Sequence, residues 1–191
     1  MTRLIIGVTG ATGTVYAVRL LQLLQRTEIE THLVMSRWGQ RTLLHETNYT
    51  REEVEALADH VHNANDQGAP ISSGSFLTAG MMVVPCSVRS LAAIAHGLGE
   101  HLVHRAADVV LKERRKLLLA VREAPLSEIH LENMLRLSRM GAIICPPVPA
   151  FYQKPATLDD LVTQTCRRML DQFGIHLDGE RWSGEMAVGE D

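Results

Sequence analysis

Short apolar segments alternate with amphipathic segments along most of the chain. The apolar runs predict five strands, over residues 4–9, 30–35, 81–85, 116–122 and 142–145. Helical spacing of apolar residues follows each run, over residues 15–24, 37–46, 87–96, 127–139 and 158–173. Because the apolar stretches within these strands are continuous rather than alternating, both faces of the strands are expected to be buried. The order of elements therefore predicts an α/β fold, a parallel sheet with helices on both faces.

Capping residues and loops support this division. Ser87 and Thr157 stand at the N-cap positions of two predicted helices, and Gly174 follows the last one. The polar segment 63–75 and the segment 146–155, which holds four prolines, are predicted to be loops. We expect one domain over residues 1–182 and a frayed tail over residues 183–191.

Composition narrows the class of protein. The 191 residues are 46% apolar and carry a formal net charge of −3, which predicts one folded domain and excludes disorder and nucleic-acid binding by bulk charge. Three widely spaced cysteines do not form a disulfide framework. No apolar run approaches the length of a membrane span, and the first residues lack a signal peptide. We expect a soluble cytoplasmic protein.

In parallel α/β sheets, ligands bind at the carboxyl ends of the strands. The first strand is followed by glycines at GxxGxxG spacing and by the hydroxyl of Thr12, which indicates either an anion site or a plain tight turn. Ser36 follows the second strand, where it could reach a ligand or only cap a helix. Ser87 and Ser90 follow the third strand and predict another anion cradle, whereas Cys86 beside them is interpreted as structural.

Further polar and aromatic residues each allow a functional and a structural interpretation. Arg105, Asp108 and Lys112 share one predicted helical face, which is either solvated or binds phosphate. Arg122 and Glu123 directly follow the fourth strand, where a crevice is expected. The aromatic pair at 151–152 lies in the proline-rich loop and could face a planar ring or simply cover the core.

Nine histidines raise the question of a metal ion. His60 and His62 are close in sequence, as are His101 and His104, but the chain contains no HExxH and no Cys/His set with ligand spacing. We therefore expect no metal site.

Taken in order, eight motifs resemble the flavin prenyltransferase (UbiX-type) family, which includes the small subunits of aromatic and phenolic acid decarboxylases. These motifs are GVTGATG (7–13), LVMS (33–36), SSGSF (72–76), VVPCSVRSLAAIAHG (83–97), RAADVVLKERRKLLL (105–119), REAPLS (122–127), HLENMLRLSRMGA (130–142) and PPVPAFYQKP (146–155). The resemblance covers nearly the whole chain. It implies a three-layer Rossmann or flavodoxin-like fold.

The resemblance also implies an activity. Family members transfer a dimethylallyl group from dimethylallyl phosphate to N5 and C6 of reduced FMN without a metal, and the prenylated FMN serves a partner decarboxylase. They form homo-oligomers, typically dodecamers, with sites at subunit junctions. Two alternatives stay open: an accessory subunit that binds FMN without turnover, and a flavin-dependent cysteine decarboxylase-like enzyme. The segments PCSVRS and PPVPAFY differ from the PASANT and PxMNxxMW segments of the latter group.

Site residues are carried over by position in these motifs. FMN binding is implied for Gly10, Ala11, Thr12, Ser36, Ser87, Val88, Arg89, Ser90 and Arg122. Prenyl-phosphate binding is implied for Arg105, Lys112, Glu123, Tyr152, Arg168 and Trp182. Catalytic roles are implied for Thr12, Glu46, Lys112 and Glu123. The family's usual residue at position 12 is serine, so Thr12 keeps the hydroxyl and adds a methyl group.

These residue types suit the chemistry. Phosphate leaves an allylic carbon only when its developing charge is met, and arginine and lysine donors can meet it without a metal. The carbocation needs a dry, electron-rich environment, which aromatic rings provide. The departing phosphate could itself accept the proton lost from C6.

Overall fold

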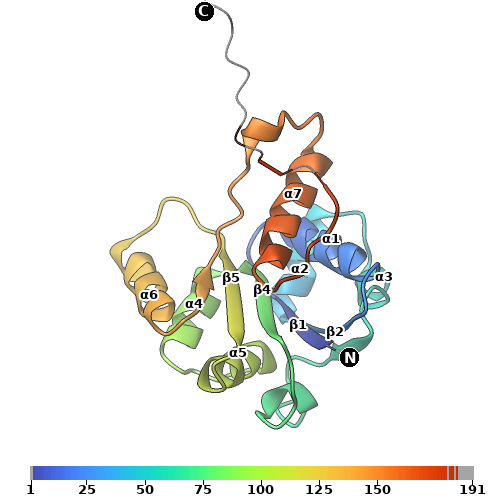
Figure 1. Ribbon diagram of the computed structural model, residues 1–191. Helices are drawn as coiled ribbons and strands as arrows, with labels where there is room; N and C mark the ends of the chain where they lie inside the picture. The colour runs from blue at the N-terminus through green and yellow to red at the C-terminus, as the bar shows by residue number, and fades with distance from the viewer. Residues whose placement is uncertain (1, 180, 183, 185–191) are drawn as a thin grey trace, which may run out of the picture.

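Six parallel strands form one sheet in the order β3-β2-β1-β4-β5-β6. The computed structural model describes residues 2–179, 181, 182 and 184 (Figure 1). Within them the strands are β1 (Thr2–Val8), β2 (Ile29–Met35), β3 (His60–His62), β4 (Gly80–Cys86), β5 (Lys116–Val121) and β6 (Ile143–Ile144). This is the doubly wound order of Rossmann-like folds, so the predicted fold class is confirmed.

Seven α-helices cover the two faces of the sheet in the described part of the chain. They are α1 (Thr14–Leu24), α2 (Arg37–Glu46), α3 (Arg51–Glu55), α4 (Val88–Ala95), α5 (Leu102–Lys112), α6 (Glu128–Arg139) and α7 (Leu158–Asp171). Residues of α1, α2, α3 and α7 share one buried apolar cluster, and residues of α4, α5 and α6 share the other (Figure 1). Two short 3₁₀ turns, Pro70–Ser72 and Phe151–Gln153, lie in the predicted loops.

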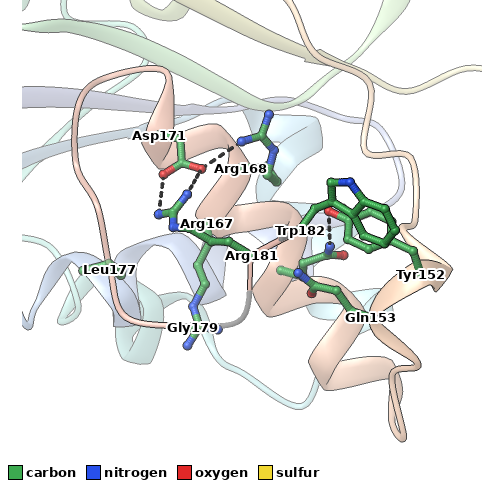
Figure 2. Close-up of a pocket in the computed structure, with 10 residues that line it drawn as sticks. Tyr152, Gln153, Arg167, Arg168, Asp171, Leu177, Gly179, Arg181 and Trp182 are labelled. Carbon is green, nitrogen blue, oxygen red and sulfur yellow. Dashed lines mark hydrogen bonds and ion pairs between the residues drawn. The ribbon is translucent and has the colours of Figure 1, made fainter. Parts of the chain in front are cut away.

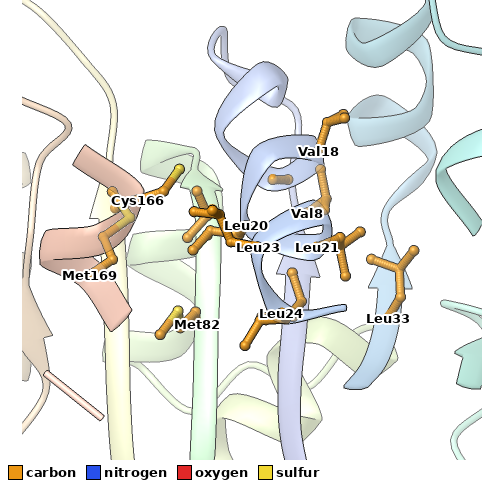
Figure 3. Close-up of a cluster of buried hydrophobic side chains, with 14 of the residues drawn as sticks. Val8, Val18, Leu20, Leu21, Leu23, Leu24, Leu33, Met82, Cys166 and Met169 are labelled. Atoms are coloured by element: carbon orange, nitrogen blue, oxygen red, sulfur yellow. The ribbon is translucent and has the colours of Figure 1, made fainter. Parts of the chain in front are cut away.

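The first cluster joins α1 and α7 to the sheet. Four leucines of α1 point at the strands, and α7 brings Cys166 and Met169 against them (Figure 3). Leu20 and Leu21 are fully buried, and each such side chain stabilises the fold by about 1.5–3 kcal/mol. Burial raises the pKa of the Cys166 thiol, so this cysteine is a core residue.

The expected caps are present. Ser87 accepts a hydrogen bond from the backbone N–H of Ser90, and Thr157 accepts one from Asp160. Gly174 has a φ of 74°, which favours glycine after the helix.

The sheet differs from the sequence prediction at one edge. A sixth strand, β3, pairs with β2, and α3 precedes it. Its three residues are too few to show periodicity, and its apolar content is a single valine, so no run marked it. The expected tail, 183–191, lies outside the described residues except for Gly184. No helix in the described part of the chain is long and apolar enough to span a membrane.

Candidate functional site

A crevice opens where the strand order reverses, between β1 and β4. The loops that follow β1, β2, β4 and β5, with the start of α5, enclose a cavity of about 710 Å³. We call it the switch-point cavity. Its lining residues are Gly10, Ala11, Thr12, Ser36, Arg37, Trp38, Ser87, Val88, Arg89, Ser90, His101, His104, Arg122 and Glu123. All nine residues to which the resemblance gave FMN binding therefore lie around one space.

Thr9 holds the two central loops together. Its hydroxyl donates to the carbonyl oxygen of Pro85 at 2.8 Å and accepts from the N–H of Ser87 at 2.8 Å. Thr9 is 1% exposed, so water does not compete for these bonds. The turn after β1 and the N-terminus of α4 consequently form one rigid floor.

Two helix N-termini point at the cavity, each with a serine cap. The Ser36 hydroxyl accepts a hydrogen bond from the N–H of Gly39 at 3.0 Å, so Ser36 caps α2. The same residue also lines the switch-point cavity. Ser87 accepts from Ser90 N–H and donates to the Ser90 hydroxyl, both at 3.2 Å. The positive ends of α2 and α4 favour a bound anion here.

A buried histidine, His104, contacts one of these hydroxyl groups. His104 is 2% exposed, and its Nε2 lies 3.1 Å from the hydroxyl oxygen of Ser90. Burial, with a smaller contribution from His101, lowers the pKa of His104 to about 4. The ring is therefore neutral at pH 7 and adds a hydrogen bond without adding charge.

Trp38 forms a wall of the cavity and leans against Gly10. A Cβ added at Gly10 would collide with the Cβ of Trp38, so only glycine fits there. The indole is 59% exposed in the single chain, although it lines the cavity. An exposed aromatic face of this kind suits stacking on a planar ring.

Glu46 stands beside the turn that carries Thr12. Its carboxylate accepts from the N–H of Gly13 at 2.8 Å, from the N–H of Thr14 at 3.1 Å and from the Thr14 hydroxyl at 3.0 Å. Burial would raise the pKa of Glu46, but hydrogen bonds from Thr12, Gly13 and Thr14 hold it below its ordinary value. Glu46 is therefore an anion that caps α1.

A second cavity, of about 390 Å³, lies between α7 and the chain that follows it (Figure 2). We call it the C-terminal pocket. It is lined by Tyr152, Gln153, Gln164, Arg167, Arg168, Asp171, Leu177, Gly179, Arg181 and Trp182. The rings of Tyr152 and Trp182 meet edge to face, with centroids 5.5 Å apart. This pocket brings together three of the residues expected at the prenyl phosphate: Tyr152, Arg168 and Trp182.

Asp171 organises the cations of the C-terminal pocket. It accepts from Arg168 at 3.0 Å, from Arg181 at 2.8 and 2.9 Å and from His176 at 3.0 Å. Hydrogen bonds from Arg181, and then from His176 and Arg168, hold the pKa of Asp171 well below its usual range despite burial. The carboxylate thus fixes the guanidinium groups at the pocket wall.

Arg105 and Lys112 lie apart from both cavities in a single chain. Arg105 pairs with Asp108 at 2.8 Å and donates to the carbonyl of Ser72, and Lys112 pairs with Glu113. Lys112 stands just before β5 begins, whereas Arg122 follows its end. Six residues of strand span about 20 Å. One chain therefore does not gather the whole set expected at the prenyl phosphate.

Sequence reasoning missed five residues of the switch-point cavity or its supports: Thr9, Arg37, Trp38, His101 and His104. Trp38 carried a usable signal, because it follows Ser36 closely at a strand end. The His101/His104 spacing matches one helical turn, but only the fold shows that this turn faces the cavity.

Comparison with known proteins gives the family. The Flavoprotein family model matches residues 1–170. Flavin prenyltransferase UbiX of Escherichia coli K12 is 54% identical over 188 residues, which is 96% of this chain and all of that protein. The crystal structure of AnUbiX (PadA1) in complex with FMN and dimethylallyl pyrophosphate is 52% identical, with a TM-score of 0.93 over 97% of this chain and 99% of that one.

A second solved structure is a dodecameric FMN-dependent UbiX-like decarboxylase from Escherichia coli O157:H7. It is 56% identical and superposes with a TM-score of 0.94 over 96% of this chain and 100% of that chain. Sequence identity above 50% over nearly the full length, together with the shared fold, is sufficient to assign the protein to a family. The chain belongs to the UbiX-like flavin prenyltransferase family.

Proposed function

We infer that this chain transfers a dimethylallyl group from dimethylallyl phosphate to reduced FMN. The observation that carries this inference is the likeness to AnUbiX, a protein crystallised with FMN and dimethylallyl pyrophosphate, over 97% of the chain. In the reaction the allylic C–O bond breaks and phosphate leaves with its electron pair, while new C–N and C–C bonds form at N5 and C6 of the flavin. The N5–H and C6–H bonds break in turn; one proton adds to the prenyl double bond and the other goes to phosphate.

The switch-point cavity fits FMN. The N-terminus of α4, with Ser87, Arg89 and Ser90, offers N–H, hydroxyl and guanidinium donors to a phosphate. Trp38 offers a flat apolar face to the isoalloxazine ring. Bound here in reduced form, FMN supplies the electron-rich centre that accepts the prenyl group.

The C-terminal pocket suits the other substrate. Arg168 would meet the charge that develops on the leaving phosphate, and the Tyr152 and Trp182 rings would keep water from the carbocation. The ion pair with the Asp171 carboxylate positions the Arg168 guanidinium before the substrate binds.

We further propose that neighbouring copies complete the site. Lys112 ends α5 about a strand length from Arg122, and its side chain is 47% exposed. A solved relative is dodecameric, which supports assembly of this chain into an oligomer. In that oligomer, α5 of one copy would reach the C-terminal pocket of another. The junction would then hold Arg105, Lys112, Glu123, Tyr152, Arg168 and Trp182.

The product would pass to a decarboxylase that uses prenylated FMN.

We also propose a cytoplasmic location, because all three cysteines are free thiols, as is usual in a reducing compartment.

The central test incubates pure protein with reduced FMN and dimethylallyl phosphate under anaerobic conditions. Mass spectrometry of the flavin should show a gain of one C5 unit. Tight binding of unchanged FMN would instead indicate the accessory-subunit alternative. Turnover of a cysteinyl peptide with FMN alone would indicate the cysteine decarboxylase-like alternative.

The junction has its own test. At dimethylallyl phosphate concentrations below KM, Lys112→Ala and Arg168→Ala each should lower the rate at least tenfold. Co-expression of the two variants should restore part of the activity, because some junctions then combine two intact halves. Failure of mixed oligomers to recover activity would contradict the shared site while leaving the transferase assignment intact.

A further inference from the structure

Four polar residues meet on one face of the outer two strands of the sheet. Glu30 and His32 alternate along β2, and His60 and His62 alternate along β3. The strands pair in parallel with His32 opposite His60 and Val34 opposite His62, so all four side chains project to the same side. We call this group the edge cluster.

Three ligand atoms of the edge cluster converge. Oε1 of Glu30 lies 3.1 Å from Nε2 of His32 and 3.2 Å from Nε2 of His60. All three atoms lie within 4.8 Å of one another. The edge of a zinc coordination tetrahedron with such ligands is about 3.3 Å, so a modest movement of the half-exposed His60 ring would close the set.

The fourth residue orients the most buried ligand. Nδ1 of His32 lies 2.9 Å from Nε2 of His62. When Nδ1–H donates to His62, Nε2 of His32 presents its lone pair toward Glu30 and His60. Metal-binding histidines commonly donate their other N–H in this way, which fixes the tautomer and the ring direction.

The charges around the edge cluster partly balance. The Glu30 side chain is 14% exposed, and its carboxylate faces the rings of His32 and His60. Arg3 is the opposing charge: its Nε lies 3.2 and 3.3 Å from the two carboxylate oxygens of Glu30.

We propose that Glu30, His32 and His60 bind one divalent transition-metal ion of the Zn²⁺ type, with His62 as the orienting partner. Two imidazoles and a carboxylate form a donor set that zinc takes readily, and water can fill the fourth position. The ion would tie the short edge strand β3 to β2. It stands apart from the prenyl transfer, since His32, the proposed ligand on β2 nearer to Ser36, is separated from Ser36 by about 13 Å of strand.

The sequence expectation of no metal site rested on linear spacing. The edge cluster combines two residues from each of two strands nearly thirty positions apart, and only the β2–β3 register aligns them. The inference concerns a structural ion, so it does not depend on the transferase reaction.

The test uses tag-free protein that has been stripped with a chelator. Titration with Co²⁺ should produce the visible bands of a tetrahedral site at one ion per chain, and Zn²⁺ should displace them. Zn²⁺ should also raise the melting temperature by several degrees, because the ion binds the folded state.

Four variants sharpen the result. His60→Gln should weaken Zn²⁺ binding more than tenfold, and His62→Gln, which removes only the orienting partner, should weaken it about tenfold. Arg3→Gln should strengthen it, because a competing cation is removed. His45→Gln removes an exposed histidine elsewhere and should bind Zn²⁺ as the parent does.

Equal Zn²⁺ affinity in His60→Gln and the parent would overturn the proposal, as would binding by an adventitious ion only, with no fixed stoichiometry. FMN binding, measured on every variant, confirms that each has folded.

Discussion

Glu46 accepts a hydrogen bond from the backbone N–H of Gly13, with 2.8 Å between the two atoms. The last residue of α2 thereby caps the first turn of α1, and Thr12 lies in the turn that joins β1 to α1. Gly13 has a φ of 101°, so the chain needs glycine to bring its N–H to the carboxylate. A residue expected to be catalytic is thus also a structural support, and the two roles can be separated.

Substitution of Glu46 tests both roles. Glu46→Ala removes the cap and should lower the free energy of unfolding by about 1–2 kcal/mol as well as the rate of transfer. Glu46→Gln keeps one acceptor oxygen, so it should cost less stability but still slow transfer because the negative charge is gone. Urea unfolding and flavin mass spectrometry measure the two effects. A full rate in Glu46→Gln would show that the charge has no part in the reaction.

The hydroxyl of Thr12 is expected to act on the departing phosphate. Thr12→Ala should slow transfer about 100-fold, the usual cost of one donor at a developing anion, and change FMN affinity little. Thr12→Ser retains the hydroxyl and should keep most of the rate. Rapid-quench assays with mass detection give the rates, and unchanged turnover in Thr12→Ala would reject this role.

Arg168 is expected to bind the prenyl phosphate. Arg168→Ala should raise KM for dimethylallyl phosphate about 10- to 100-fold, since a hydrogen bond between charged groups contributes about 1.5–3 kcal/mol. FMN affinity should stay within threefold. Arg51→Ala, which breaks a surface ion pair with Glu55 on α3, is the matched control. An equal loss of FMN affinity in Arg168→Ala would place this arginine in the flavin site instead.

Buried His104 predicts a pH dependence of stability. Its pKa is lowered from 6.5 to about 4, so between these values the unfolded chain binds a proton that the folded chain excludes. Stability should therefore fall by about 2–3 kcal/mol as the pH drops from 6.5 to 4, at about 1.4 kcal/mol per pKa unit. In His104→Gln that part of the decline should disappear. Urea unfolding at pH 7 and pH 4.5 compares the two proteins, and identical declines would contradict the assignment.

Gly10 and Trp38 together set the width of the switch-point cavity. Gly10→Ala would displace the indole, and overpacking of this kind costs about 1–3 kcal/mol, so FMN should bind about tenfold more weakly. Gly99→Ala has open space around its new methyl group and should bind FMN normally. Flavin fluorescence titration measures both affinities. Normal binding in Gly10→Ala would mean that Trp38 does not contact the ring.

Sequence patterns predicted the centre of the sheet well. β1, β2, β4 and β5 have six or seven residues each, hold a continuous apolar stretch and end at clear turn or capping residues. The strand-end rule then located Thr12, Ser36, Ser87 and Arg122 around one cavity. The edge was harder, because β3 is short and polar and depends on pairing with β2 rather than on its own pattern.

Resemblance supplied what local pattern could not. Nothing near Arg168 or Trp182 in sequence marks a substrate pocket, because the pocket arises from the return of the chain along α7. Lys112 and Arg122 are ten positions apart in sequence, but β5 lies between them and places the two residues near opposite ends of that strand.

That separation has a consequence for the behaviour of the purified enzyme. If Lys112 of one copy serves another copy's pocket, specific activity depends on protein concentration: dilution dissociates the assembly and abolishes turnover while each chain stays folded and retains its flavin. The loss would reverse on reconcentration, which distinguishes it from denaturation.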